Sequence, residues 1–416
     1  MPIGVYISVP FCRTKCSYCN FASDVFSKSA YENYVRRVIE DIRRARGMAV
    51  ELGCVLDSEA DSIYLGGGTP SILECEQLAR IFDAVREEFS VASGAEVTVE
   101  CAPGTLTPVL IDALLRCGVN RVSLGVQSFV DQEARAVGRL HTRATVLKEM
   151  ERLRDAGIDD INIDLIAGLP HQTAEGWSQS LAETIALGVP HASIYMLEVD
   201  EDSRLGRELI AGGTRYHAHF VPDEDSTADF YQQACETLNA AGVAQYEISN
   251  FARPARESRH NLKYWTRQPY IGFGVDAHSM LRAVAGDPEA IRLATPDSLD
   301  GYMNRAPHNV VQVSTEAAIE ESFFLGLRLN RGVDWGRLVS KYSSEAMAQH
   351  ELVVDECARE GLVEKDGATI RLTDRGRLLS NEVFARFLGE RQSGPAAGGE
   401  DESIGSKVGT GHVNPR

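Results

Sequence analysis

The feature that most constrains the fold is a repeated alternation of strand-like and helical segments in the first half of the chain. Six strand-like runs occur, at residues 4–9, 62–65, 96–100, 121–126, 160–166 and 192–197. Amphipathic helical patterns lie between them, for example at residues 27–48 and 144–156. Strand followed by helix, repeated six times, predicts an α/β fold in which helices wrap a parallel sheet. An open doubly wound sheet and a full or partial barrel both satisfy this pattern.

The alternation stops near Val199, which predicts that residues 1–200 form an α/β core and residues 201–310 a continuation of it. Helical patterns dominate from residue 314 to residue 388, and Asp366-Gly367 lies between two short strand-like runs as a hairpin turn would. We therefore expect a mainly helical, winged-helix-like domain at 311–390. Residues 391–416 are rich in Gly, Ser and Pro and are expected to be a disordered tail.

The charge of the chain argues against one class of partner. Lys and Arg number 42 and Asp and Glu 60, so the formal net charge is −18. Non-specific binding to nucleic acid depends on many phosphate contacts from Lys and Arg, so we expect no nucleic-acid partner. No apolar run approaches the ~20 residues of a membrane helix, and the first residues lack the pattern of a signal peptide. These features predict a cytoplasmic protein, whose oligomeric state the sequence does not indicate.

Three of the nine cysteines, Cys12, Cys16 and Cys19, stand in the spacing C-x3-C-x2-C directly after the first strand. They therefore lie on a loop at the carboxyl end of that strand, where α/β folds place active sites. Three thiolates on a tight loop can hold three irons of a 4Fe-4S cluster and leave the fourth iron open. A zinc site is the alternative, but no Cys or His follows nearby to supply its fourth ligand. The other six cysteines are expected to be lone buried thiols.

This loop and five further motifs resemble the radical S-adenosylmethionine (SAM) superfamily and, within it, the family of oxygen-independent coproporphyrinogen III oxidases and their relatives. The further motifs are Gly66-Gly-Gly-Thr-Pro-Ser71 after the second strand, Glu100, Gln127 and Asp164 at the ends of the next three strands, and Arg139 between the last two. The joint match covers most of the chain. It implies a partial (β/α)6 barrel of the TIM type that carries a 4Fe-4S cluster and binds SAM.

The resemblance also implies roles for residues that match cofactor-contacting positions of the family, namely Tyr6, Tyr18, Gly67, Gly68, Thr69, Glu100, Gln127, Arg139 and Asp164. Glu100 would pair with the ammonium group of SAM, and Gln127 and Asp164 would hold the ribose. Arg139 would lie near the SAM carboxylate, the glycine segment beside the amino end of SAM, and the two tyrosines beside the cluster. The alternative for the strand-end carboxylates is that they cap the following helices.

Two features separate the branches of this family. In the decarboxylating oxidases a fourth cysteine follows the third one after a single residue, whereas Phe21 stands there in this chain. The segment His260-Asn-Leu-Lys-Tyr-Trp265 resembles the H-N-x-x-Y-W marker of the heme chaperone (HemW) branch. That resemblance implies heme binding and delivery of heme to an acceptor protein, for which a membrane-associated protein is one candidate. The alternative is an oxidase that converts coproporphyrinogen III to protoporphyrinogen IX, and whether the chain acts as an enzyme is left open.

The chemistry of this segment suits heme. A neutral imidazole is a usual axial ligand of heme iron, which makes His260 the candidate ligand, and Tyr264 and Trp265 could stack on a porphyrin. Basic residues around the motif would attract the two heme propionates; they are Arg253, Arg256, Arg259, Lys263 and Arg267. His217, His219 and His278 are the alternative ligands.

Overall fold

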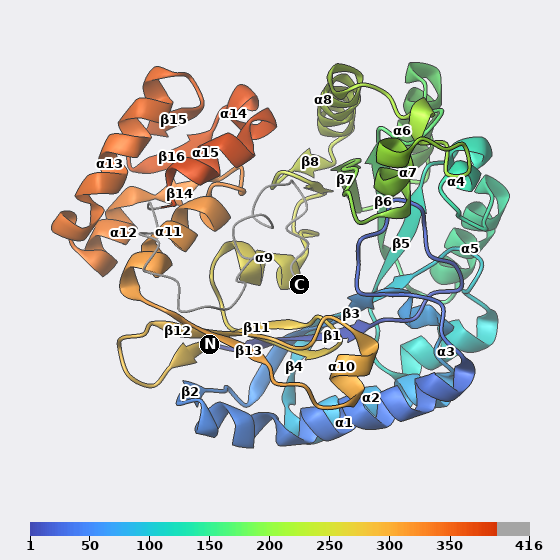
Figure 1. Cartoon of the computed structure of the whole chain (residues 1–416), viewed down its shortest axis with the longest axis horizontal. Coiled ribbons are helices and arrows are strands. Elements are labelled where there is room, and N and C mark those ends of the chain that lie inside the picture. Colours follow the sequence, from blue (N-terminus) through green and yellow to red (C-terminus); the bar gives the residue numbers. More distant parts are fainter. Residues whose placement is uncertain (389–416) are drawn as a thin grey trace.

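The computed structural model describes residues 1–388, and its centre is one 13-stranded sheet (Figure 1). Six parallel strands lie side by side in chain order: β1 (Ile3–Val9), β3 (Glu59–Gly67), β4 (Ser90–Cys101), β5 (Arg121–Gln127), β6 (Asp160–Ala167) and β7 (His191–Met196). Among the described residues, the outermost strands of the sheet are not paired with each other, so the sheet stays open. The expected partial (β/α)6 barrel is thereby confirmed. The tail predicted at 391–416 lies outside the described residues.

Helices follow the strands and cover the outside of the sheet. They are α1 (Lys28–Glu51), α2 (Cys75–Glu88), α3 (Pro108–Arg116), α4 (Asp131–Ala136), α5 (Arg143–Asp155) and α6 (Ala174–Ala186). Local chemistry sets where they begin: Thr107 accepts a hydrogen bond from the backbone of Leu110, and Pro108 occupies the first turn of α3. The strand β2 (Cys54–Val55) and the short helix η1 (Pro70–Ile72) complete this half.

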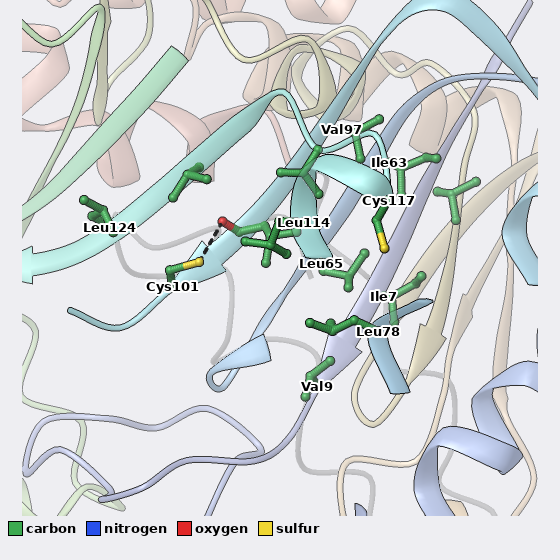
Figure 2. Close-up of a cluster of buried hydrophobic side chains, with 14 of the residues drawn as sticks. Ile7, Val9, Ile63, Leu65, Leu78, Val97, Cys101, Leu114, Cys117 and Leu124 are labelled. Atoms are coloured by element: carbon green, nitrogen blue, oxygen red, sulfur yellow. Dashed lines mark hydrogen bonds between the residues drawn. The ribbon is translucent and has the colours of Figure 1, made fainter. Parts of the chain in front are cut away.

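The main hydrophobic core lies between the strands and these helices. Figure 2 shows Ile7, Ile63 and Val97 from neighbouring strands with Leu114 from α3 and Leu78 from α2. Four of the six lone cysteines, namely Cys54, Cys101, Cys117 and Cys357, are buried, and Cys75 and Cys235 are half-buried. The expectation of buried lone thiols is confirmed for the first four.

The segment after β7 extends the sheet at both edges. Its elements are α7 (Arg204–Ala211), η2 (Ala218–Phe220), α8 (Glu224–Ala240), β8 (Ala244–Gln245), β9 (Asn250–Ala252), α9 (Arg259–Trp265), β10 (Tyr270–Gly274), β11 (His278–Ala283), β12 (Ala290–Ala294), α10 (Leu299–Met303) and β13 (Asn309–Val313). Strand β10 pairs in parallel with β1, with Tyr270 beside Gly4, on the side of β1 opposite β3. The loss of the strand–helix alternation after residue 199 therefore does not mark the end of the sheet.

The last part of the described chain has its own small sheet, in the order β14 (Val333–Asp334), β16 (Thr369–Leu372), β15 (Val363–Asp366). Its helices are α11 (Thr315–Gly326), α12 (Trp335–Tyr342), α13 (Ser344–Arg359), α14 (Asp374–Leu378) and α15 (Ser380–Arg386). Strands β15 and β16 form the expected hairpin, with Gly367 at a φ of +58° in the turn. The hydrophobic core of this part also includes Tyr264 and Trp265 of α9. None of the helices in residues 1–388 is both long and apolar enough to span a membrane.

Candidate functional site

The three cysteines, the nine residues matched to cofactor-contacting positions and His260 all line one cavity of about 180 Å³ inside the barrel. The cysteine loop closes the carboxyl end of the strands, and α9 closes the amino end. His260 of α9 reaches Gly4 and Ser62, which lie near the beginnings of β1 and β3. We call the space between these two closures the lumen.

The three cysteines sit on the loop between β1 and α1. Thr69 donates a hydrogen bond to Cys12 Sγ over 3.7 Å, and Arg139 donates to Cys16 Sγ over 3.7 Å. Burial raises the pKa of the Cys19 thiol to about 11, with a further rise from the neighbouring Cys16. Among residues 1–388 no three His, Cys, Asp or Glu side chains converge on a single-ion site. A 4Fe-4S cluster does not need such convergence, because each of three thiolates binds a different iron.

The glycine segment after β3 packs directly against this loop. The backbone N–H of Gly68 donates to Val9 O over 2.7 Å, and the N–H of Thr69 donates to Phe11 O over 2.8 Å. A Cβ on Gly68 would lie 2.7 Å from Phe11 O and 3.1 Å from Cys12 Sγ. Only glycine fits this approach, so Gly68 helps to set the position of the cysteine loop.

Gly68→Ala is therefore expected to lower the free energy of unfolding by about 1–3 kcal/mol, because the added methyl overpacks two backbone carbonyls. The iron content after cluster reconstitution should also fall, because the added methyl displaces the cysteine loop. Gly47→Ala is the matched control: Gly47 is an exposed helical residue of α1, and a methyl group added there would meet no atom within 4 Å. That variant should gain about 0.5–1 kcal/mol. Denaturant unfolding and iron analysis measure both effects, and equal stability of the two variants would contradict this account of Gly68.

Two carboxylates face the middle of the lumen. Glu100 accepts hydrogen bonds from Tyr64 Oη over 2.8 Å and from the N–H of Gly67 over 3.2 Å. Asp164 accepts from Ser123 Oγ over 3.0 Å and from Asn162 Nδ2 over 2.7 Å. Burial, followed by repulsion from Asp164, raises the pKa of Glu100 to about 7, and burial raises the pKa of Asp164 as well. A positively charged ligand bound beside these two buried acids would stabilise their ionised forms.

Gln127 and Arg139 stand beside this acidic pair. Gln127 has a φ of 67°, a strained conformation for a residue other than glycine, and its buried Oε1 has no hydrogen-bond partner within the described part of the chain. Arg139 donates to Gly125 O as well as to Cys16. Tyr6 lies lower in the lumen, with its ring centroid 6.1 Å from that of Tyr64. Tyr18 packs with a small apolar cluster at the carboxyl end of β6.

Several lumen residues were missed in the sequence. They are Tyr64, Ser123, Asn162, His191, Ser193 and Tyr195. They could have been found from the rule that every second side chain of a strand points to the same face. His191, Ser193 and Tyr195 occupy alternate positions of β7, as Asn162 and Asp164 do in β6. Polar side chains at alternate positions of an otherwise apolar parallel strand indicate a polar lumen.

The structure places His260 differently from the expectation of an open heme ligand. The side chain is 1% exposed; its Nδ1 lies 2.9 Å from Ser62 Oγ and its Nε2 2.8 Å from Tyr264 Oη. Burial lowers the pKa of this imidazole to about 3. Iron ligation by His260 stays a prediction, but it would require the loss of one of these two hydrogen bonds. Tyr264 and Trp265 are 5% and 2% exposed, so neither is open to stack on a porphyrin.

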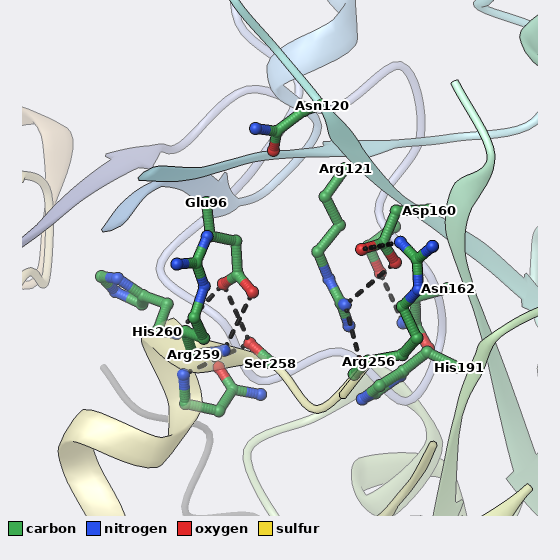
Figure 3. Close-up of polar contacts among 12 residues, drawn as sticks. Glu96, Asn120, Arg121, Asp160, Asn162, His191, Arg256, Ser258, Arg259 and His260 are labelled. Carbon is green, nitrogen blue, oxygen red and sulfur yellow. Dashed lines mark hydrogen bonds and ion pairs between the residues drawn. The ribbon is translucent and has the colours of Figure 1, made fainter. Parts of the chain in front are cut away.

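The basic patch expected around this motif is wrong for three of its five cations, because carboxylates from other elements pair with Arg256, Lys263 and Arg267. Lys263 pairs with Asp61 at 2.7 Å, and Arg256 with Asp160 at 3.4 Å. Figure 3 shows Asp160 between Arg121 and Arg256, and Glu96 of β4 at the start of α9. Glu96 accepts from Ser258 Oγ and from the N–H groups of Arg259 and His260. Arg267 pairs with two further carboxylates, those of Glu289 and Glu321.

Comparisons with known proteins agree with this architecture. Residues 6–183 match the radical SAM superfamily and residues 313–379 match the HemN C-terminal domain. The chain is 34% identical to the heme chaperone HemW of Bacillus subtilis, over 93% of this chain and 99% of that protein. It is 29% identical to the Escherichia coli protein of the same name, over 94% and 99%. It is also 29% identical to a mouse protein named radical S-adenosyl methionine domain-containing protein 1, mitochondrial, over 95% and 91%.

A solved structure shares the fold. The coproporphyrinogen III oxidase HemN of Escherichia coli superposes with a TM-score of 0.78 at 23% identity, covering 93% of this chain and 90% of that one. At this identity the likeness concerns the arrangement of the barrel and the C-terminal helices.

Proposed function

We propose that this chain, which belongs to the HemW family of heme chaperones in the radical SAM superfamily, binds heme and passes it to an acceptor protein. The observation that carries the proposal is the similarity to relatives named heme chaperones, which extends over 93% of the chain. A feature of the chain itself supports it: Phe21, and not a fourth cysteine, follows Cys19 after one residue and lines the lumen.

For the cluster, we assign Cys12, Cys16 and Cys19 to three irons of a 4Fe-4S cluster, with the fourth iron open to SAM. The three thiols line one cavity, and Arg139 and Thr69 donate to two of their sulfurs, as donors to thiolates would. When bound and reduced, the cluster supplies one electron to SAM.

For SAM, we assign Glu100 to the ammonium group, Asp164 and Gln127 to the ribose hydroxyls, and Arg139 to the carboxylate. The two acids would stabilise a bound cation, and Oε1 of Gln127, which has no hydrogen-bond partner among residues 1–388, can accept a hydrogen bond from a hydroxyl. We assign the other five predicted residues, Tyr6, Tyr18, Gly67, Gly68 and Thr69, to the walls around the cluster and SAM, and all five line the lumen.

The proposed location is the cytoplasm, where thiols stay reduced, in keeping with nine cysteines that are all unpaired. The proposed partner is a heme-acceptor protein, with a membrane-associated protein as one candidate. The net charge of −18 remains the reason to expect no nucleic-acid partner.

The proposal is tested by hemin titration of protein that has been purified without oxygen and reconstituted with iron and sulfide. We expect one heme per chain at saturation, a shifted Soret band, and the same stoichiometry with and without SAM. Protein that leaves the hemin spectrum unchanged would refute heme binding.

The oxidase alternative is measured on the same preparation. Coproporphyrinogen III is incubated with SAM and a reductant, and the products are separated by chromatography. We expect no decarboxylated porphyrin, and a product that accumulates over many turnovers would favour the oxidase.

A further inference from the structure

Two histidines that the site above does not use meet at the surface of the molecule. His171 follows β6 at the carboxyl end of the barrel, and His217 lies between α7 and η2. His171 Nε2 is 3.1 Å from His217 Nδ1, and both side chains are half-buried. The ring of Phe220 stacks on that of His171 with centroids 4.1 Å apart, and Phe220 is 57% exposed.

The backbone holds this pair in a conformation that is costly for histidine. His171 and His217 have φ values of 67° and 61°, in the left-handed region, which costs roughly 1–2 kcal/mol for each. Three hydrogen bonds maintain it: the N–H of His171 donates to Phe220 O, the N–H of Phe220 donates to His217 O, and the N–H of Ala218 donates to Glu208. Strained residues of this kind, held by their surroundings, are characteristic of functional sites.

The contact between the rings leaves one nitrogen available. When the Nδ1 proton of His217 is donated to Nε2 of His171, the lone pair of His217 lies on Nε2. No side chain or backbone group within residues 1–388 hydrogen-bonds to that Nε2. An imidazole oriented by a hydrogen bond at one nitrogen, with the other nitrogen open, is the usual arrangement of a metal-ligating histidine.

We propose that Nε2 of His217 is a ligand of the heme iron, that His171 is the positioning residue for its ring, and that Phe220 contacts the porphyrin. This inference rests on the proposed heme-binding function and specifies where the heme is held. Phe220 offers an exposed aromatic face next to the pair. Arg215, whose guanidinium lies 5.3 Å from the Tyr216 ring centroid, supplies a cation for a propionate.

The location suits a protein that must release its cargo. His260 is enclosed by protein, whereas the His171–His217 pair is at the surface, where an acceptor can reach the heme. The same segment also contacts the cysteine loop, through the N–H of Leu205 on Ser17 O at 2.8 Å and Arg204 on Lys15 O at 3.2 Å. Heme bound here would therefore lie on a segment that is hydrogen-bonded to the cluster loop.

The experiment is hemin titration of the reconstituted full chain carrying His217→Asn, His171→Asn, His219→Asn or His260→Ala. Asparagine tolerates the left-handed backbone, so the first two variants should fold. We expect His217→Asn to weaken hemin binding at least tenfold and to lose the spectrum of a histidine-ligated heme, which added imidazole restores. His171→Asn should weaken binding a few-fold with ligation retained. Iron and sulfide content should match the parent protein in both.

His219→Asn is the matched control, because His219 is an exposed histidine two residues from His217. This variant should keep the parent spectrum and affinity. His260→Ala should do so too, because the assignment to His217 replaces the sequence-based prediction that His260 ligates the iron. Parent-like binding by His217→Asn, or loss of the ligated spectrum only in His260→Ala, would overturn the assignment to His217 and leave the heme-binding function standing. A parent chain that binds no hemin would instead refute the proposed function, which keeps the two failures distinct.

Discussion

Cys16→Ser is expected to eliminate the iron–sulfur cluster, with loss of the broad absorption near ~400 nm that such clusters show. A hydroxyl is a harder ligand than a thiolate and is less readily deprotonated, so the iron held by Cys16 loses its anchor. Cys16 is also buried, at 8% exposure, and its sulfur accepts a hydrogen bond from Arg139. Iron and sulfide analysis after anaerobic reconstitution gives the result directly.

Cys235→Ser is the matched control for this change. Cys235 lies on α8, is half-buried, and does not line the lumen. Its replacement should leave the absorption and the iron content unchanged. A full cluster in the Cys16→Ser protein would mean that the three-cysteine loop is not the cluster site, and the SAM assignments that depend on it would fall as well.

The sequence predicted the parts of the fold that are encoded locally. Each strand and the helix after it are adjacent in the chain, so periodicity was enough to find the six repeats, and the C-x3-C-x2-C spacing was enough to find the loop. The pairing of β10 with β1 joins residues more than 260 positions apart, as with Gly4 and Tyr270. No local pattern reports such a contact, which is why the sequence predicted a continuation of the core at residues 201–310 but not the strands with which it extends the sheet.

The lack of long-range information in the sequence also explains why the basic patch around His260 was overestimated. Around His260 the sequence shows cations close together, but the carboxylates that neutralise them come from distant strands: Asp61 precedes its partner Lys263 by about 200 residues. Counting charges along the sequence overestimates a basic patch when the folded chain places carboxylates from distant segments beside it. The lumen acids were predicted because they match motifs of the family that the sequence resembles, whereas Tyr64, which donates a hydrogen bond to Glu100, looks like an ordinary strand residue in the sequence.

Glu100→Gln is expected to keep the cluster and to weaken SAM binding. A charge-assisted hydrogen bond is worth roughly 1.5–3 kcal/mol, which corresponds to about a ten- to hundredfold loss of affinity. Glu133→Gln is the matched control, since Glu133 is a buried carboxylate that does not line the lumen. Calorimetric titration of SAM measures both variants, and an unchanged affinity in Glu100→Gln would mean that Glu100 has a structural role alone.

The raised pKa of Glu100 adds a pH dependence. With a pKa of about 7, the carboxyl is mostly protonated at pH 6 in the SAM-free protein and mostly ionised at pH 8. The ammonium group of SAM prefers the ionised form, so the parent protein should bind SAM more weakly at pH 6 than at pH 8, by up to about tenfold for one pH unit below the pKa. Glu100→Gln should lose most of this difference.

Glu100 should also lower the stability of the SAM-free protein at a pH above its pKa. Burial raises the pKa of Glu100 from 4.5 to about 7, so the folded state binds its proton more tightly than the unfolded state does. The stabilisation that the protonated group gives is complete below pH 4.5 and is lost as the pH rises through 7, on the order of 3 kcal/mol in total. Glu100→Gln, which cannot ionise, should therefore raise the melting temperature at pH 8 and change it little at pH 5. An equal gain at both pH values would assign the effect to packing, and a loss at pH 8 would contradict the raised pKa on which the cation-binding site is argued.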